Sequence, residues 1–220
     1  CIMLFIVFID RKEPVLRYLT LLVGGLKGLY KKFFRQSVIE GGYVARRMNM
    51  KIVSLMEDTP GGNGCLFEHG FSLYVETKSH RILADTGASC RFLENAKRLG
   101  IDLAKVDTVI LSHGHYDHSG GILAFAGKNP NARIYIRENA FEDFYHVKDH
   151  GRRYIGIDKE IKKLEQVVIA GSDLRIDEEL FLFTNVTGRR MWPEGNRELK
   201  VVKNGELLQD DFSHEQYLII

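Results

Sequence analysis

Short apolar segments separated by polar turns make up most of the chain. Residues 51–57 alternate between apolar and polar side chains, which predicts a strand, and the glycine-rich residues 58–64 predict a loop. Residues 70–77 and 80–85 predict the two strands of a hairpin, joined by a polar two-residue turn. The first regular part of the chain is therefore expected to be a β-sheet.

The apolar spacing changes after this hairpin. Apolar residues recur at helical spacing over residues 90–99 and predict a helix that ends at Gly100. The apolar run 106–111 predicts a strand covered on both faces. Residues 121–126 then predict a short helix, and residues 133–137 a further strand.

Aromatic residues distinguish the next segment, residues 139–146. Phe141, Phe144 and Tyr145 are spaced as on one face of a helix, so a helix is predicted there. Beyond Lys163 the pattern returns to strands. The predicted strands are residues 166–170, 174–176, 180–185, 199–202 and 207–208. This order predicts an α/β (α+β) fold with two sheets and helices outside them.

Residues 1–47 differ from the rest of the chain in charge. They hold nine Lys/Arg against three Asp/Glu, whereas residues 48–220 hold 22 against 26. Their apolar run at residues 1–9 is too short for a bilayer, which takes about 20 residues. A signal, an anchor or an interfacial helix is one interpretation, and upstream sequence foreign to the natural protein is the other. The predicted domain is therefore residues 48–220, without a membrane-crossing segment.

Composition narrows the classes of protein. The chain is 45% hydrophobic and 27% charged, which is ordinary for a globular protein, and a net charge of +2 does not favour a nucleic-acid binder. Its three cysteines lack CxxC spacing, so no disulfide framework is expected and a reducing, cytoplasmic location is favoured. The expected partner is a small-molecule substrate. The oligomeric state stays open.

The segment 111–121, LSHGHYDHSGG, carries the clearest chemistry. Side chains two apart on an extended strand end share one face, so His113 and His115 can point at one metal ion. Asp117 and His118 follow in the turn that opens the next helix and can reach a second ion. Imidazole and carboxylate suit Zn²⁺ and also Fe or Mn. The alternative is a polar surface turn.

The HxHxDH pattern of residues 113–118 resembles the motif of the metallo-β-lactamase superfamily. That resemblance implies a four-layer αβ/βα sandwich, two divalent metal ions with zinc favoured, and a metal-activated water. It makes Asp117 both a ligand and the catalytic group that orients the water. Asp85, in Asp-Thr-Gly, resembles the superfamily's strand-end aspartate, which orients the metal ligands without binding the metal itself. A plain turn aspartate is the alternative.

Further segments resemble one group of that superfamily, the dihydropterin synthase-like proteins. They are Cys65–Glu76 (CLFEHGFSLYVE), the DTGAS element, LGIDL at residues 99–103, and DDFSHEQ at residues 210–216. The resemblance implies a hydrolase, or a related synthase, acting on a small phosphorylated or pterin-like heteroaromatic substrate. A thioester or lactone hydrolase and a non-catalytic metal-binding sensor are the alternatives. A di-iron redox protein is disfavoured because such relatives carry a carboxylate at position 115.

One departure from the family pattern concerns the downstream ligands. The superfamily takes a further histidine from a later segment, in this group one that resembles Gly-Cys-Ser-His, followed by a final histidine. After residue 118 this chain has only His146, His150 and His214, none in that context. The expectation is that the remaining ligands lie beyond residue 220, so that the fold is incomplete at its C-terminus.

Weaker candidates lie outside the motif. His69 follows Glu68 in the loop before the hairpin and is a candidate substrate or metal contact, with simple loop polarity as the alternative. His214 is a candidate site residue, with a solvated loop as the alternative. His146 and His150 favour a surface role. The remaining candidates are Lys148, Arg152 and Arg153, a basic cluster for an anion or a solvated face, and Trp192, which could stack on a flat ring or simply be buried.

Overall fold

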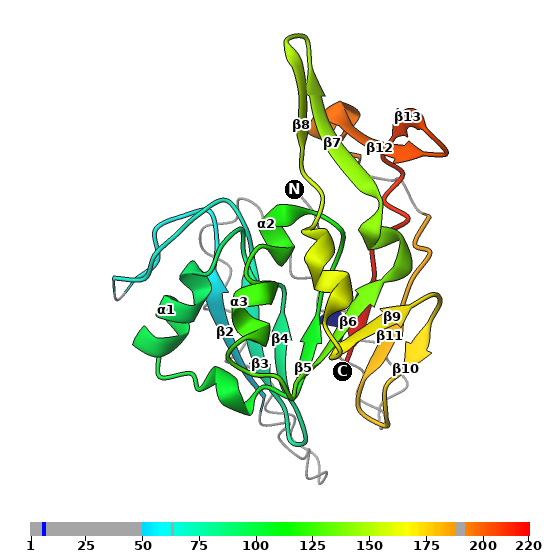
Figure 1. Ribbon diagram of the computed structural model, residues 1–220. Coiled ribbons are helices and arrows are strands. Elements are labelled where there is room, and N and C mark those ends of the chain that lie inside the picture. The colour runs from blue at the N-terminus through cyan, green and yellow to red at the C-terminus, as the bar shows by residue number, and fades with distance from the viewer. Residues whose placement is uncertain (1–5, 8–49, 63, 188–191) are drawn as a thin grey trace, which may run out of the picture.

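A computed structural model describes residues 6–7, 50–62, 64–187 and 192–220 of the 220-residue chain. Its strands form three sheets, and the α-helices lie together on one side of the largest sheet (Figure 1). Apart from residues 6–7, the predicted N-terminal extension 1–47 lies outside the described residues.

The central sheet has six strands in the order β2-β3-β4-β5-β6-β9. The strands are β2 (Lys51–Met56), β3 (Ser72–Glu76), β4 (Arg81–Ala84), β5 (Thr108–Ile110), β6 (Arg133–Arg137) and β9 (Val167–Ala170). Strands β2, β3 and β4 are antiparallel, which confirms the predicted hairpin, and the pairs from β4 to β9 are parallel. The carboxyl ends of β4, β5 and β6 therefore meet at one edge of the sheet.

The helices cover one face of this sheet. They are α1 (Arg91–Arg98), α2 (Tyr116–Ser119) and α3 (Ile122–Ala126), with 3-10 turns η1 (Leu103–Lys105) and η3 (Lys159–Lys163). Phe92 of α1 and Phe125 of α3 are fully buried in the core on this face, together with Leu83 and Val109 from the strands. The helices predicted at 90–99 and 121–126 are confirmed to within one or two residues, and Gly100 has a positive φ of 69° just past α1.

A second sheet packs on the opposite face in the order β1-β14-β11-β10. Its strands are β1 (Ile6–Val7), β14 (Tyr217–Ile219), β11 (Phe181–Phe183) and β10 (Leu174–Arg175). Leu182 and Leu218 of this sheet share a buried core with Ile82 and Ile110 of the central sheet. Since neighbours on a strand point to opposite faces, Ile82 and Leu83 serve the two different cores.

The third sheet corrects the prediction of two sheets. Its order is β13-β12-β7-β8, with β13 (Glu206–Gln209), β12 (Leu199–Lys203), β7 (Asp143–Lys148) and β8 (Gly151–Tyr154). The predicted helix at 139–146 is wrong, because only a 3-10 turn, η2 (Glu138–Phe141), precedes the strand β7. Phe144 faces a small core with Ile155 and Val201, whereas Tyr145 points the other way and packs edge-on against Tyr154.

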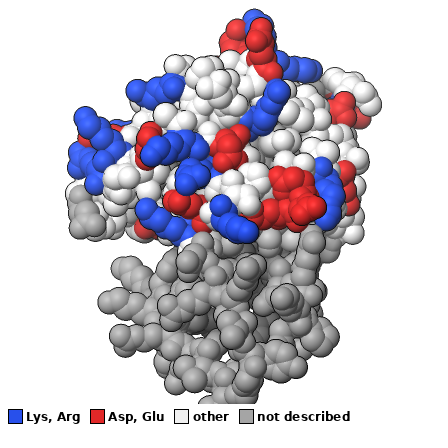
Figure 2. All heavy atoms as spheres, turned by 90° about the horizontal axis from the view of Figure 1, so that it is seen from below, with Lys and Arg blue, Asp and Glu red and all other residues white. Residues whose placement is uncertain are grey.

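The described helices are short, and the described surface carries charges of both signs (Figure 2). Among the described residues, every helix is too short or too polar to cross a bilayer. On the face seen in Figure 2, lysines and arginines are interspersed with aspartates and glutamates over the described part of the chain. The α/β class predicted from the sequence is confirmed.

Candidate metal centre

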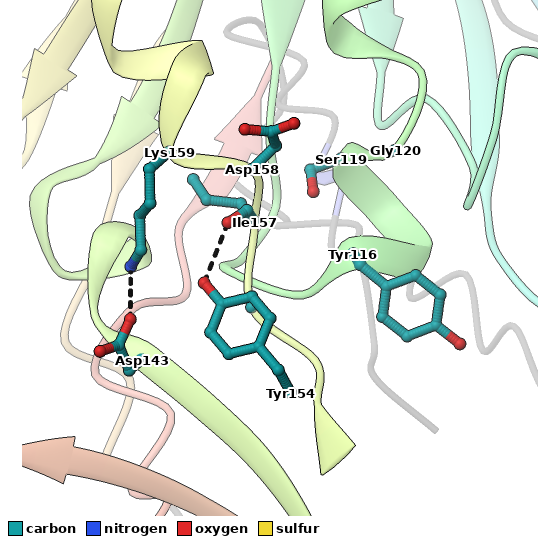
Figure 3. A pocket seen from close by; sticks show the side chains of 9 residues that line it. Tyr116, Ser119, Gly120, Asp143, Tyr154, Ile157, Asp158 and Lys159 are labelled. Carbon is teal, nitrogen blue, oxygen red and sulfur yellow. Dashed lines mark hydrogen bonds and ion pairs between the residues drawn. The ribbon is translucent and has the colours of Figure 1, made fainter.

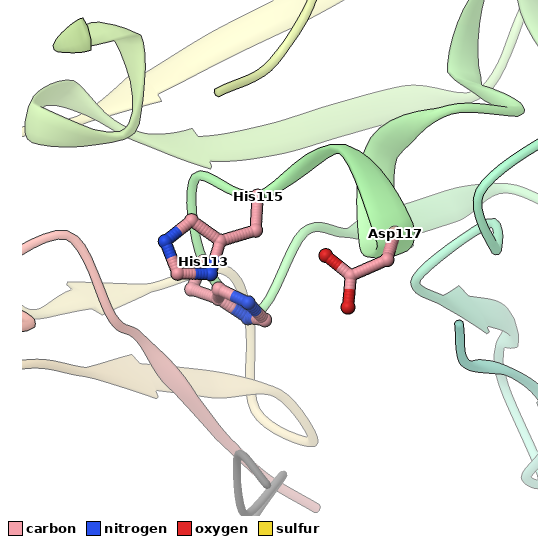
Figure 4. A group of neighbouring side chains, drawn as sticks. All are labelled: His113, His115 and Asp117. Carbon is pink, nitrogen blue, oxygen red and sulfur yellow. The ribbon is translucent and has the colours of Figure 1, made fainter. Parts of the chain in front are cut away.

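The histidine-rich segment lies at the carboxyl end of β5. His113 and His115 follow the strand directly, and Asp117 and His118 lie on the short helix α2. The ring centroids of His113 and His115 are 4.8 Å apart, and those of His113 and His118 are 4.1 Å apart. Figure 4 shows the Asp117 carboxylate turned toward the two imidazoles, and one ligand atom from each of these three residues lies within 4.8 Å of the others. The structure thus brings all four predicted residues together.

Close backbone packing holds α2 against the strand end of β4. The amide of Thr86 donates to the carbonyl of His118 at 2.7 Å, and the amide of Gly120 donates to the carbonyl of Gly87 at 2.9 Å. A Cβ at Gly120 would lie 2.1 Å from the carbonyl oxygen of Ala88, so only glycine fits at this position. The Asp-Thr-Gly element and the Gly120-Gly121 pair therefore fix the position of α2 relative to the end of β4.

Asp85 lies behind the histidines with no exposed surface. Its Oδ2 lies 2.7 Å from Nδ1 of His118 and accepts a hydrogen bond from the hydroxyl of Ser112 at 2.7 Å, while its Oδ1 accepts from the Ser112 amide. Burial opposes the charged form of His118, but the Asp85 charge and hydrogen bond outweigh it and raise the pKa of His118. With Nδ1 engaged by Asp85, Nε2 of His118 faces Asp117, 3.6 Å from its Oδ2.

Two imidazole nitrogens in the cluster are buried and lack a hydrogen bond within the described part of the chain. They are Nε2 of His113 and Nε2 of His115. Burial, followed by the neighbouring imidazoles of His118 and His115, lowers the pKa of His113 well below its usual value. His113 is therefore a neutral ring whose Nε2 has no partner, which is a metal-ligand arrangement because the lone pair on that nitrogen is available. The donor set and the unpartnered Nε2 of His113 fit a divalent cation.

A second cluster, which the sequence did not predict as a group, adjoins the first. Asp210 and His214 are both fully buried, and Nε2 of His214 lies 3.1 Å from Oδ1 of Asp210. Oδ2 of Asp210 approaches Nε2 of His115 at 3.3 Å, without the alignment of a hydrogen bond. The solvated-loop alternative for His214 is wrong. Asp210 was missed, although its place four residues before His214 in the DDFSHEQ segment was a usable signal.

His69 lies at the open side of the cluster with a side chain that is 70% exposed. Its Nδ1 is 3.0 Å from Oδ1 of Asp58, and its Nε2 is 3.4 Å from Oδ2 of Asp117. Asp58 also accepts a hydrogen bond from the Gly70 amide, which ties the two loop ends together. Neighbouring Glu68 is occupied elsewhere, since it accepts from both the amide and the hydroxyl of Ser89.

A sequence profile described as the Metallo-beta-lactamase superfamily matches residues 66–202, which include the whole HxHxDH segment. The chain belongs to the metallo-β-lactamase superfamily. An uncharacterized protein of Methanocaldococcus jannaschii is 31% identical over 175 residues, covering 76% of this chain and 65% of that protein. The family and the α/β fold expected from the motif are thereby confirmed.

Two further relatives have descriptive names. The 7,8-dihydropterin-6-methyl-4-(beta-D-ribofuranosyl)-aminobenzene-5'-phosphate synthase of the same organism is 37% identical over 101 residues, 43% of this chain and 34% of that enzyme. The crystal structure of Tm1679, described as a metal-dependent hydrolase of the beta-lactamase superfamily, is 36% identical with a TM-score of 0.62, covering 77% of this chain and 60% of that one. The chain thus spans about two thirds or less of the relatives it matches.

Other sequence candidates lie on the third sheet of this metallo-β-lactamase fold. Arg153 lies over the ring of Tyr116, with its guanidinium carbon 5.6 Å from the centroid, and Arg152 lies over Tyr145 at 5.0 Å. Lys148 pairs with Glu198, which also lies 2.6 Å from Nε2 of His146. These side chains are separated between the two faces of a hairpin, so the structure does not gather Lys148, Arg152 and Arg153 into one anion site. His150 is exposed in the turn of that hairpin, as predicted.

Trp192 lies nearer to the metal cluster. Its ring packs edge-on against Phe212 at a centroid distance of 5.3 Å, and Phe212 stacks on His214 at 5.6 Å. The side chain is half-buried, so the ring is partly held by the fold and partly open. Its predicted stacking on a flat substrate ring stays a prediction.

A cavity of about 670 Å³ lies beside α2 (Figure 3). Tyr116, Ser119 and Gly120 line it from one face of the helix, whereas Asp117 and His118 on the other face do not. Two of its charged side chains, Lys159 and Asp143, pair with each other at 2.8 Å, and the Tyr154 hydroxyl donates to the carbonyl of Ile157. The metal cluster and this cavity are therefore back to back across α2.

Proposed function

We propose that this chain acts as a metal-dependent hydrolase of the metallo-β-lactamase superfamily, or as a synthase related to one, on a small phosphorylated or heteroaromatic substrate. The observation that carries the proposal is the convergence of His113, His115 and Asp117, with His118 beside them, around a buried Nε2 of His113 that has no hydrogen bond among the described residues. Burying such a nitrogen is costly unless something binds it.

Those four side chains would hold two divalent ions, with zinc the best match to imidazole and carboxylate and iron or manganese the other candidates. When bound, such ions supply hydroxide near neutral pH and stabilise negative charge on oxygen. Asp85 would fix His118 with Nε2 toward the cations, because its carboxylate engages Nδ1 at 2.7 Å.

Asp117 would act as the catalytic carboxylate, since it projects from α2 into the cluster and its side chain is only 14% exposed. It can orient a water proton while His69 closes the open side of the site. His69 would contact the substrate through Nε2, because Asp58 holds its Nδ1 and turns Nε2 inward. A phosphoryl or carboxyl group would meet this edge first.

The proposed substrate class rests on the named relatives together with the aromatic side chains of Trp192 and Phe212. The synthase of M. jannaschii is named for a product that is both a dihydropterin and a phosphate. In this chain Trp192 and Phe212 pack edge-on beside His214, which provides a ring for a flat heterocycle to stack on. The synthase match covers 101 residues, so it supports the class of substrate rather than one molecule.

Metal content and turnover test the proposal together. The purified protein should bind divalent metal, measured by elemental analysis, and should hydrolyse at least one of a phosphomonoester, a phosphodiester, a lactone or a thioester. His115→Ala and His118→Ala should each lose metal and lower kcat/KM by at least about 100-fold, as expected when a ligand or catalytic group is removed.

His146→Ala is the matched control, because His146 is a half-buried histidine that pairs with Glu198 on the third sheet. It should keep both metal and turnover. Metal bound without turnover of any compound would favour a sensor over an enzyme. Absence of bound zinc, iron and manganese from the wild-type protein would overturn the proposal.

A further inference from the structure

Asp210 and His214 lie outside the HxHxDH motif, yet both are fully buried against it. They come from a segment about 100 residues after His113, and His214 packs 5.1 Å from the ring of His115 and 5.8 Å from that of His113. A buried carboxylate between two imidazoles is costly to desolvate and persists only when its hydrogen bonds are made. The hydrogen bond to His214 and the close contact with His115 indicate where the protons of the two imidazoles lie.

The proton on His214 is fixed by the backbone. The amide of Gly114 donates to Nδ1 of His214 at 2.9 Å, so Nδ1 must be the acceptor. A neutral imidazole with Nδ1 as acceptor carries its proton on Nε2. That Nε2 faces Oδ1 and Oδ2 of Asp210 at 3.1 and 3.2 Å, so His214 donates to the carboxylate.

The carboxylate then acts on His115. Oδ1 of Asp210 also accepts from the amide of Phe212 at 2.9 Å, which leaves Oδ2 facing Nε2 of His115 at 3.3 Å. An ionised carboxylate only accepts hydrogen bonds, so a lone pair on Nε2 would face an oxygen lone pair. Contact is favourable only when Nε2 of His115 carries the proton.

We propose that Asp210 and His214 are positioning residues that keep the proton of His115 on Nε2, so that Nδ1 is the atom His115 offers to a metal ion. This assignment concerns the same metal site and rests on the proposed function. It also means that His113 and His115 would bind metal through different ring nitrogens. Ser112 contacts Nδ1 of His113, which leaves Nε2 as that ring's free atom, whereas His115 would bind through the opposite nitrogen.

Imidazole ¹⁵N chemical shifts test the proton positions without any metal. Metal-free protein labelled at histidine nitrogens, with signals assigned by His115→Gln and His214→Gln, should show both rings protonated at Nε2. On adding Zn²⁺, the Nδ1 signal of His115 should shift while Nε2 of His214 keeps its proton. A proton on Nδ1 of His115, or loss of the His214 Nε2 proton to zinc, would overturn the inference.

Asp210→Asn tests the consequence for binding. The amide is neutral, a weaker acceptor, and carries an NH₂ group in place of one oxygen, so the affinity for Co²⁺, measured by competition with a chelator, should fall about 10- to 100-fold, and the visible Co²⁺ absorption spectrum should change shape. Asp211→Asn is the matched control, since that neighbouring carboxylate is exposed and pairs with Lys203. The control should leave both affinity and spectrum unchanged.

Two failures can be told apart in this experiment. If the wild-type protein binds no Co²⁺, the proposed function fails and this inference fails with it. If the wild-type protein binds Co²⁺ and Asp210→Asn binds it equally well with the same spectrum, only the role of Asp210 and His214 is overturned. Should Asp210→Asn fail to fold, the wild-type ¹⁵N shifts still decide the inference.

Discussion

Asp85 shows how a single residue can serve backbone geometry and metal chemistry at once. It has a φ of 59°, a left-handed conformation, and its side chain binds Ser112 twice and contacts His118. Asparagine tolerates that backbone better than other residues, so Asp85→Asn changes mainly the charge and one acceptor. We predict that it lowers zinc affinity about 10- to 100-fold, because Nε2 of His118 is no longer held toward Asp117.

Zinc affinity by chelator competition measures this effect, with circular dichroism to confirm the fold. Asp107→Asn is the control, because Asp107 also pairs with a histidine, His80, at 2.9 Å but lies far from the cluster along β5. Equal zinc affinity in Asp85→Asn and the wild type would show that Asp85 is only a turn residue.

At the scale of elements, the contact between α2 and the end of β4 positions Asp117 and His118. A Cβ at Gly120 would meet the backbone of Ala88 at 2.1 Å, and backbone atoms cannot rotate away. We predict that Gly120→Ala displaces α2, lowers the free energy of unfolding by about 1–3 kcal/mol and weakens metal binding. Urea denaturation and metal titration measure the two effects.

Gly127→Ala provides the comparison. Gly127 lies just after α3, and its added Cβ would meet only ordinary contacts, the shortest being 3.6 Å. It should leave metal binding intact and change stability by less than about 1 kcal/mol. If Gly120→Ala behaves like Gly127→Ala, then close packing does not set the position of α2.

A second inter-element contact links the central sheet to the second sheet through His80. Its Nδ1 pairs with Asp107 before β5 at 2.9 Å, and its Nε2 pairs with Asp177 before β11 at 2.8 Å. Burial opposes the charged ring, but the hydrogen bond and charge of Asp107, helped by Asp177, prevail and raise the pKa of His80 above its usual 6.5. Protonated His80 therefore stabilises the folded state.

Because the pKa of His80 is higher in the folded protein than in the unfolded chain, the stability of the fold depends on pH. A raised folded-state pKa gives stability that is fully present below the unfolded pKa of about 6.5 and is lost as the pH rises through the folded value. We predict that His80→Gln destabilises the protein more at about pH 5.5 than at about pH 8.5. Urea unfolding at both pH values measures this, and His150→Gln on an exposed turn is the control. A pH-independent difference would contradict the role of the ion pairs.

At the scale of the whole molecule, contacts between distant segments explain which predictions succeeded. Local periodicity predicted the hairpin of β3 and β4 and the helix α1, because their apolar faces recur within a few residues. The helix predicted at residues 139–146 was wrong because Phe141, Phe144 and Tyr145 have the spacing of a helical face. Pairing with β12, more than 50 residues later, instead makes this segment a strand.

The same limit applies to the candidate site. His113, His115, Asp117 and His118 lie within six residues, so the sequence could group them. Asp210 and His214 reach the cluster only because β14 and the segment before it return across the sheet edge, with the side chain of Gln216 donating to the carbonyl of Leu111 at 2.8 Å. The sequence offered His214 as a candidate, but no local pattern encodes a contact across 100 residues, so the grouping of Asp210 and His214 with the motif needed the structure.

The two cores on either face of the central sheet should make the described fold respond as one unit. Leu218 of β14 is 1% exposed and shares its core with Ile82, whose neighbour Leu83 belongs to the other core. We predict that Leu218→Ala lowers the free energy of unfolding by about 2–5 kcal/mol. Because the sheet joins both cores, fluorescence and circular dichroism should still report one coincident urea transition.

Leu208→Ala is the control for that experiment, since Leu208 lies in β13 of the third sheet and is 43% exposed. It should change stability by no more than about 0.5 kcal/mol. Two separate transitions in Leu218→Ala would show that the second sheet unfolds without the first. Local unfolding of the second sheet would then also disrupt the metal cluster. His214 lies only a few residues before β14 and would lose its position beside His115 when that strand detaches.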